Sequence, residues 1–68
     1  MNGIIKTLAQ AKASAAYLAK LHGRTMCVFP VPEHSGAYQL GYRFGVCGAD
    51  DRADYEQDGA TIIAEVAP

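Results

Sequence analysis

The sequence lacks a long apolar stretch. No run approaches the roughly 20 apolar residues that a membrane-spanning helix needs. The first residues also lack the basic cluster and continuous apolar segment of a secretory signal, because Lys6, Thr7, Gln10 and Lys12 interrupt them. We therefore expect a cytoplasmic protein without a membrane partner.

Cysteine is also scarce, since the 68 residues contain only Cys27 and Cys47. Two cysteines are too few for a disulfide framework, and in a reducing compartment they stay free thiols. A chain of this length buries only about 60% of the surface that its unfolded form exposes. Domains of this size usually gain stability from disulfides, a metal or a partner subunit, so a homodimer is one expectation.

Acidic residues are missing from the first third of the chain. Residues 1–24 contain four cations and no acid, whereas residues 25–68 contain seven acids against Arg43 and Arg52. The net charge of −1 therefore combines two segments of opposite sign. The four cations are Lys6, Lys12, Lys20 and Arg24.

Residues 3–22 have the spacing of an amphipathic helix, with apolar residues every three or four positions. The apolar stripe consists of Ile4, Leu8, Ala11, Ala15, Leu18 and His22, and the opposite side carries Lys6, Gln10, Ala13, Tyr17 and Lys20. Alanine is the best helix former, Asn2 is a suitable N-cap, and Gly23 is suited to end the helix. The spacing predicts one long helix over residues 3–22, with the stripe from Ile4 to Leu18 in the core.

Three later segments have the pattern of strands: residues 25–31, 37–47 and 60–66. The middle segment alternates over ten residues, which is the clearest strand pattern in the chain. The composition of residues 32–36 indicates a turn. If this turn pairs Val31 with Ala37, Leu40 and Tyr42 lie in the core under the helix and Cys27 lies opposite Gly41. The other face of the sheet is then solvated or approached by something flat.

Residues 48–59 form an acidic segment that fits either a loop or a helical turn beginning at Asp50 or Asp51. With it, the chain reads as one α+β domain over residues 1–68. The predicted fold is one long N-terminal helix packed on a three-stranded antiparallel sheet, in the order α-β-β-β, with an acidic loop at 48–59.

No pattern in the chain predicts a cofactor, a metal site or a catalytic site. The segment from Asp54 to Glu65 comes close to an EF-hand calcium loop, but Glu56 and Ile62 depart from the pattern and a strand follows in place of a helix. The histidines and cysteines, which could bind zinc, are not arranged in the closely spaced pairs of a zinc site. They are His22, Cys27, His34 and Cys47. No glycine-framed nucleophile or phosphate loop is present. We expect a protein that is not an enzyme.

Nucleic-acid binding is the alternative hypothesis. Within residues 40–46, Gly41, Tyr42 and Phe44 match the aromatic strand of an RNA-recognition motif, but the strand that carries the second aromatic motif is missing. The predicted helix offers four cations, yet a sequence pI near 6.0 implies weak binding to phosphates. The sequence therefore favours a protein partner over nucleic acid.

In size, in element order and in its lack of catalytic residues, the chain resembles the small inhibitors encoded by phages and mobile elements, of which anti-CRISPR proteins are one class. The resemblance lies in architecture and covers no specific residues. It implies a small non-enzymatic module that binds a larger protein complex as an inhibitor or adaptor. The candidate partner-binding residues are Asp50, Asp51, Asp54, Glu56, Asp58, Tyr17, Lys6, Lys20 and Arg43.

Overall fold

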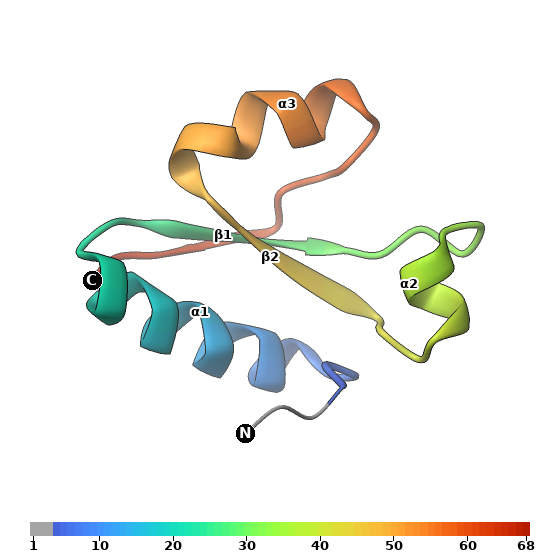
Figure 1. Ribbon diagram of the computed structural model, residues 1–68, viewed down its shortest axis with the longest axis horizontal. Helices are drawn as coiled ribbons and strands as arrows, with labels where there is room; N and C mark the ends of the chain where they lie inside the picture. Colours follow the sequence, from blue (N-terminus) through green and yellow to red (C-terminus); the bar gives the residue numbers. More distant parts are fainter. Residues whose placement is uncertain (1–3) are drawn as a thin grey trace.

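The computed structural model describes residues 4–68 and confirms the predicted architecture: one long helix packs on a three-stranded antiparallel sheet in the order α-β-β-β (Figure 1). The helices are α1 (Leu8–His22), α2 (Gly36–Gln39) and α3 (Arg52–Gln57), with a 3-10 turn η1 (Ala49–Asp51) before α3. The strands are β1 (Met26–Pro30), β2 (Phe44–Gly48) and β3 (Ala64–Val66), arranged in the sheet as β2-β1-β3.

Helix α1 begins later than the spacing predicts, because a capping box fixes its start. The amide of Gln10 donates to the hydroxyl of Thr7 at 3.1 Å, and the amide of Thr7 donates to the side chain of Gln10 at 3.1 Å. Both donors would otherwise be unsatisfied at a helix start. The predicted start at residue 3 is therefore wrong, and the predicted cap Asn2 lies outside the described residues. The end agrees with the prediction, since Gly23 follows His22 with a φ of 65°.

The buried side of α1 is built from alanines. Ala11, Ala15 and Ala19 are fully buried and pack against Met26 and Val28 of β1. Their small side chains let the helix backbone approach the sheet closely. The predicted stripe is thus right at its centre and wrong at its ends: Ile4, Leu8 and His22 are exposed, while Leu18 is partly buried.

The connection between β1 and β2 differs most from expectation. Residues 36–39 form helix α2, because the hydroxyl of Ser35 caps it by accepting the amide of Tyr38 at 3.2 Å. Gly41 then turns the chain with a φ of 105°. The predicted strand over residues 37–47 is therefore wrong in its first part, and β2 begins only at Phe44.

The later start of β2 changes the register of the sheet. The amide of Val31 donates to the carbonyl of Arg43 at 2.9 Å, so the predicted pairing of Val31 with Ala37 is wrong. Met26 lies opposite Gly48 and Cys27 lies opposite Cys47, where the sequence had placed Gly41. The core positions expected for Leu40 and Tyr42 are filled by Phe44 and Val46, and Leu40 is 70% exposed.

Strand β3 pairs with the free side of β1, which makes β1 the central strand. It covers only residues 64–66 of the predicted 60–66, although the amide of Ile63 still donates to Val28 at 2.9 Å. Ala64 and Val66 join the core under α1.

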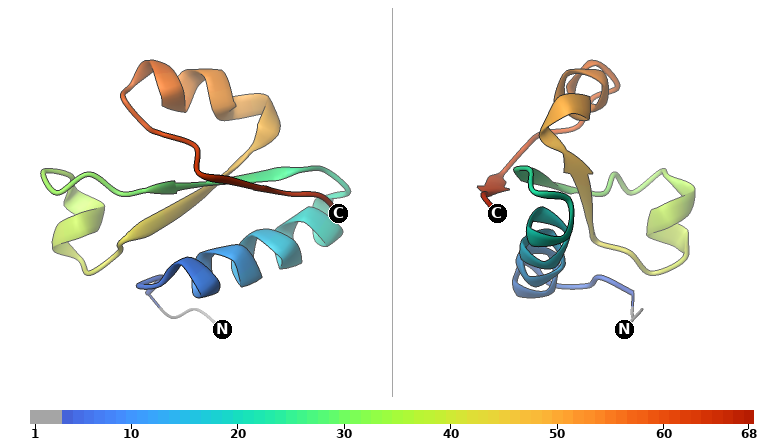
Figure 2. Two further views of the ribbon diagram at one scale, coloured as in Figure 1. Left: turned by 180° about the vertical axis from the view of Figure 1, so that it is seen from behind. Right: turned by 60° about the vertical axis from the view of Figure 1, so that its left-hand side comes forward.

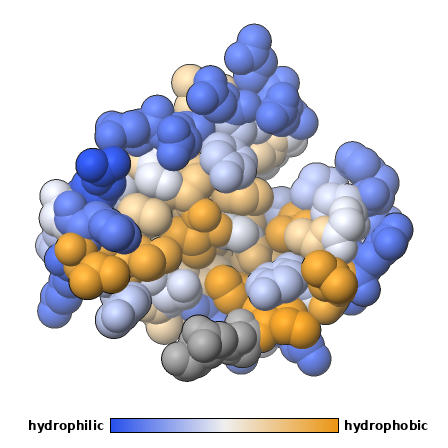
Figure 3. Space-filling model, in the orientation of Figure 1, coloured by the Kyte–Doolittle hydropathy of each residue, from blue (hydrophilic) through white to orange (hydrophobic). Residues whose placement is uncertain are grey.

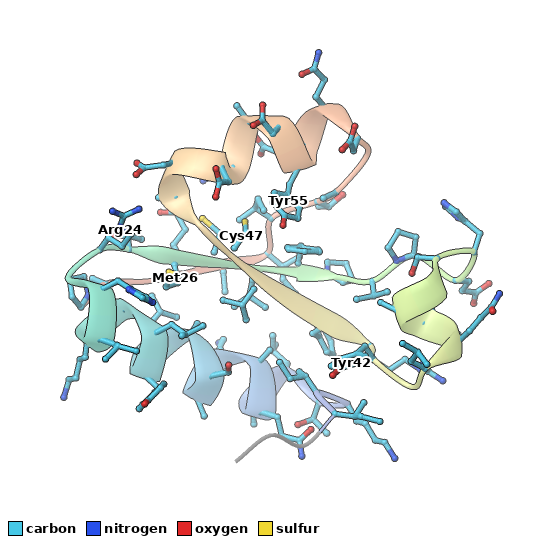
Figure 4. All side chains as sticks on the ribbon, viewed as in Figure 1. Arg24, Met26, Tyr42, Cys47 and Tyr55 are labelled. Carbon is cyan, nitrogen blue, oxygen red and sulfur yellow. The ribbon has the colours of Figure 1, made fainter. Side chains whose placement is uncertain are left out.

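The second face of the sheet is covered by a helix, where the sequence predicted solvent or a flat partner. The predicted acidic loop over residues 48–59 is instead η1 followed by α3, the helical alternative. Tyr55 of α3 points toward the sheet (Figure 4), and its ring centroid lies 5.1 Å from that of Phe29. Helices α1 and α3 therefore lie on opposite faces, giving three layers (Figure 2).

The contact between Phe29 and its cross-strand neighbour Gly45 yields a stability prediction. A Cβ added at Gly45 would lie 2.6 Å from Cζ of Phe29. Gly45→Ala must therefore displace a ring that also contacts Tyr55, and we expect it to lower the free energy of unfolding by about 1–3 kcal/mol in urea titration.

Gly36→Ala is the matched control for this substitution. A Cβ at Gly36 meets no atom within 4 Å, and the position does not require a positive φ. We expect it to leave stability unchanged or to raise it by about 0.4–1 kcal/mol. Equal effects of the two substitutions would contradict the close Phe29–Gly45 contact.

Candidate functional site

The five acids predicted to bind a partner lie along η1 and α3, the last at the C-cap of α3. We call this set the acidic surface: Asp50, Asp51, Asp54, Glu56 and Asp58. All five are exposed. Arg52 is the single cation in residues 48–59.

Arg52 forms one ion pair inside the acidic surface and a second with a residue of strand β3. Its Nε donates to Glu56 at 3.1 Å, and its Nη1 pairs with Glu65 of β3. Asp50 pairs with Arg24, the second residue after the end of α1, at 3.1 Å. Asp51, Asp54 and Asp58 form no ion pair with any other residue in the part of the chain that the structure describes. The surface therefore keeps a concentrated negative charge.

The lysines lie on the other side of the sheet, in α1 or just before it. Lys12 and Lys20 belong to this helix and are exposed, and Lys6 precedes it. Eight residues of helix separate the first two, which turns their side chains about 80° apart around the axis. Since Arg24 is paired with Asp50, α1 does not present its cations as one compact phosphate-binding row. Nucleic-acid binding by this helix stays a prediction without added support.

Arg43, a predicted partner-binding residue, has partners within the fold. Its guanidinium lies 3.7 Å from the ring centroid of Tyr38 and donates to the carbonyls of Tyr38 and Tyr42 at 3.0 and 3.2 Å. These contacts connect α2 to the start of β2. The structure therefore gives Arg43 a role in holding this turn and places it away from the acidic surface.

Tyr17 stands on the outer side of α1, as the spacing predicts, and is 67% exposed. Leu21, one turn later, is 60% exposed, so the two form an apolar pair beside Lys20. The sequence reading missed Leu21, although its four-residue spacing from Tyr17 was a sufficient signal.

An apolar cleft of about 340 Å³ lies where α2 approaches β1 and β2. It is lined by Phe29, Val31, Pro32, Ser35, Ala37, Tyr42, Phe44, Gly45 and Val46. Figure 3 shows the surface hollowed between the α3 and α2 sides of the molecule. The cleft could not be predicted, because it depends on α2, whose residues alternate like those of a strand.

Cys27 and Cys47 are buried and lie directly opposite each other on neighbouring strands. Cys47 points to the α3 side of the sheet (Figure 4). Burial raises the pKa of the Cys27 thiol, and burial with the neighbouring Cys27 raises the pKa of Cys47 to about 11. The thiolate is the reactive form of cysteine. The pair is therefore poorly suited to nucleophilic chemistry at neutral pH and acts in the packing under α3.

The raised thiol pKa values predict how stability depends on pH. Above the ordinary pKa of 9.0, the unfolded chain loses these protons while the folded chain keeps them up to about 11. Because the folded state then binds more protons, the free energy of unfolding should fall as the pH rises from 9 to 11. Urea titrations across this range should show a shallower fall for Cys47→Ala than for the unaltered chain. Identical pH dependence in both proteins would contradict the raised pKa of Cys47.

Residues 4–68 contain no group of three or more His, Cys, Asp or Glu side chains placed to hold a metal ion. Within the same residues, no helix has both the length and the apolar character needed to cross a membrane. Comparisons of the chain with protein-family models, curated proteins and solved structures gave no match.

Proposed function

We propose that this chain is a small non-enzymatic module that binds a larger protein through the acidic surface and acts as its inhibitor or adaptor. The observation that carries the proposal is the separation of charge by layer. The acidic surface lies on one face of the sheet, and Lys12 and Lys20 lie with α1 on the other. Such an arrangement complements a basic surface of a partner and steers its approach.

The acidic surface concentrates negative charge that the described part of the chain neutralises only in part. Asp50, Asp54 and Asp58 follow one another at four-residue spacing. Asp50 lies in η1, Asp54 in the first turn of α3 and Asp58 at its C-cap, so the three charges extend along the whole segment. Only Asp50 of the three has a cation partner among the described residues. Recognition of a basic partner is a physical reason to keep the other two charges unneutralised.

The acidic surface is also held in place before binding. Helix α3 has only six residues, too few to be stable alone. The Tyr55–Phe29 contact and the ion pair between Arg52 and Glu65 tie it to the sheet. A surface that is already ordered loses less conformational entropy when a partner binds. Helix α3 is therefore suited to hold the acidic surface in position for a partner.

The chain's size and its resemblance in architecture to phage and mobile-element inhibitors, anti-CRISPR proteins included, suggest the inhibitor form of the proposal. In that form, the acidic surface covers a basic site on a larger complex. An adaptor would use the same surface while leaving the partner active. An activity assay on the captured partner distinguishes the two.

Charge reversal within the acidic surface tests the proposal. We expect Asp54→Lys to weaken capture of the partner by at least about tenfold, equivalent to 1.4 kcal/mol of binding free energy. The partner is first identified by affinity capture from the native host with mass spectrometry and then titrated in purified form. Because Asp54 is exposed, in the first turn of α3, the change in unfolding free energy should stay below about 1 kcal/mol.

Glu33→Lys is the matched control, since Glu33 is also exposed and the change in charge is identical. It lies in the turn before α2, outside the acidic surface, and should leave capture nearly unchanged. Equal capture by Asp54→Lys and the unaltered chain would remove the acidic surface from the proposal. Equal losses in both variants would show that only net charge matters.

A further inference from the structure

Strand β2 forms one edge of the sheet, and most of its outward backbone groups have no partner within residues 4–68. Val31 donates to the carbonyl of Arg43 and Ala49 donates to that of Thr25. Bonded residues alternate in an antiparallel ladder, so Gly45 and Cys47 face β1 while Phe44, Val46 and Gly48 face outward. Within residues 4–68 no second strand pairs with these three residues, and of their outward groups only the carbonyl of Gly48, the N-cap of η1, accepts a hydrogen bond, the first of that turn.

The two edges of the sheet differ in how they are protected. Strand β3 has three residues, one of which is Glu65, and a proline follows at position 68. Short length, charge and proline are the usual devices that prevent edge strands from pairing. Strand β2 has five residues, Phe-Gly-Val-Cys-Gly, with neither a charge nor a proline. The β2 edge is therefore open to pairing and the β3 edge is not.

The surroundings of the β2 edge are apolar. The cleft beside it includes Phe44 and Val46 of the strand itself. Figure 3 faces this edge, and apolar residues gather there over α1, β2 and α2. Pairing at this edge would remove apolar surface from water as well as satisfy backbone groups.

We propose that the β2 edge pairs with the β2 edge of a second copy of the chain, antiparallel and centred on Val46. Val46 then lies opposite Val46 of the second copy, and Phe44 lies opposite Gly48. All three outward-facing residues fall at hydrogen-bonded positions, and because the Gly48 carbonyl belongs to η1, the free groups give about four backbone hydrogen bonds across the joint. The result is a continuous six-stranded sheet.

The charges at the two ends of β2 favour antiparallel over parallel pairing, although Arg43 and Asp50 also have partners within their own copy. Arg43 precedes β2, and Asp50 and Asp51 follow it after Ala49. Antiparallel pairing places Arg43 opposite Ala49 of the other copy, next to its Asp50. A parallel arrangement would bring like charges together, which is unfavourable. The bulky Phe44 also meets the smallest residue, Gly48, so the edge is complementary to itself.

The size of the core gives a second reason for a partner copy. Among residues 4–68, seven hydrophobic residues are buried, and the largest fully buried side chains are those of Val28 and Cys27. Domains of this size gain needed stability by oligomerisation. This inference is independent of the proposed function, although the dimer would carry both acidic surfaces on one face of the joined sheet.

Gly48→Pro tests the joint without replacing any residue of the acidic surface. Gly48 has a φ of −70°, which proline also adopts, and its Cβ position is open, with Asp51 Oδ2 at 4.0 Å. Proline removes the outward amide and places a ring on the edge. Gly48→Ala keeps the amide and is the matched control.

Light scattering coupled to size exclusion, over about 5 to 500 µM, should give twice the chain mass of 7.2 kDa for the unaltered protein and for Gly48→Ala. Gly48→Pro should raise the dimer dissociation constant by about tenfold or more. An unaltered chain that stays monomeric throughout, or a Gly48→Pro variant that dimerises as tightly, overturns the inference.

Amide hydrogen exchange of the unaltered protein tests the same joint without any substitution. The amides of Phe44, Val46 and Gly48 should be protected in the dimer and lose protection on dilution. Exchange of these amides at an unprotected rate in a dimeric sample overturns the pairing. Neither measurement involves the larger partner, so failure of this inference leaves the test with Asp54→Lys unaffected.

Discussion

The ring of Phe29 lies across the backbone of Gly45 on the neighbouring strand and also contacts Tyr55 of α3. Only a residue without a side chain leaves room for a ring this close, so the contact fixes which residue of β2 faces Phe29. The same register places Cys27 opposite Cys47 and thereby determines which residues lie on the face of the sheet that α3 covers. Because Tyr55 packs on Phe29, the position of the acidic surface depends on this aromatic–glycine pair.

Local physical chemistry made part of this fold predictable. Alanines at helical spacing and Gly23 at the helix end act within a few residues, and the structure confirms both. The order of elements was equally accessible, because the composition changes sharply between segments. The segregation of charge along the chain was visible too, and the layers turn it into segregation in space. For the site, sequence alone could name the acids but not show which of them are paired.

The errors arise where two local signals compete. Tyr38, Leu40 and Tyr42 alternate as a strand would, but the hydroxyl of Ser35 caps a short helix through the amide of Tyr38. A helical turn of this length has too few residues to show its own periodicity. Without α2, the sequence pairs Val31 with Ala37, which lies six residues before Arg43, its partner in the structure. Every cross-strand neighbour then changes, which is why the opposition of Cys27 and Cys47 and the cleft beside α2 were beyond prediction.

The edge and the acidic surface occupy different sides of the molecule and can act together. Since the net charge is only −1, two copies repel weakly as whole molecules. Joining β2 edges extends the sheet sideways and leaves both α3 helices on the same face, so one acidic surface is not pressed onto another. Ionic screening acts over about 8 Å at physiological salt, which limits repulsion between the two surfaces. A partner with basic groups spanning both surfaces would bind bivalently and, by binding the dimer more tightly, would favour dimerisation.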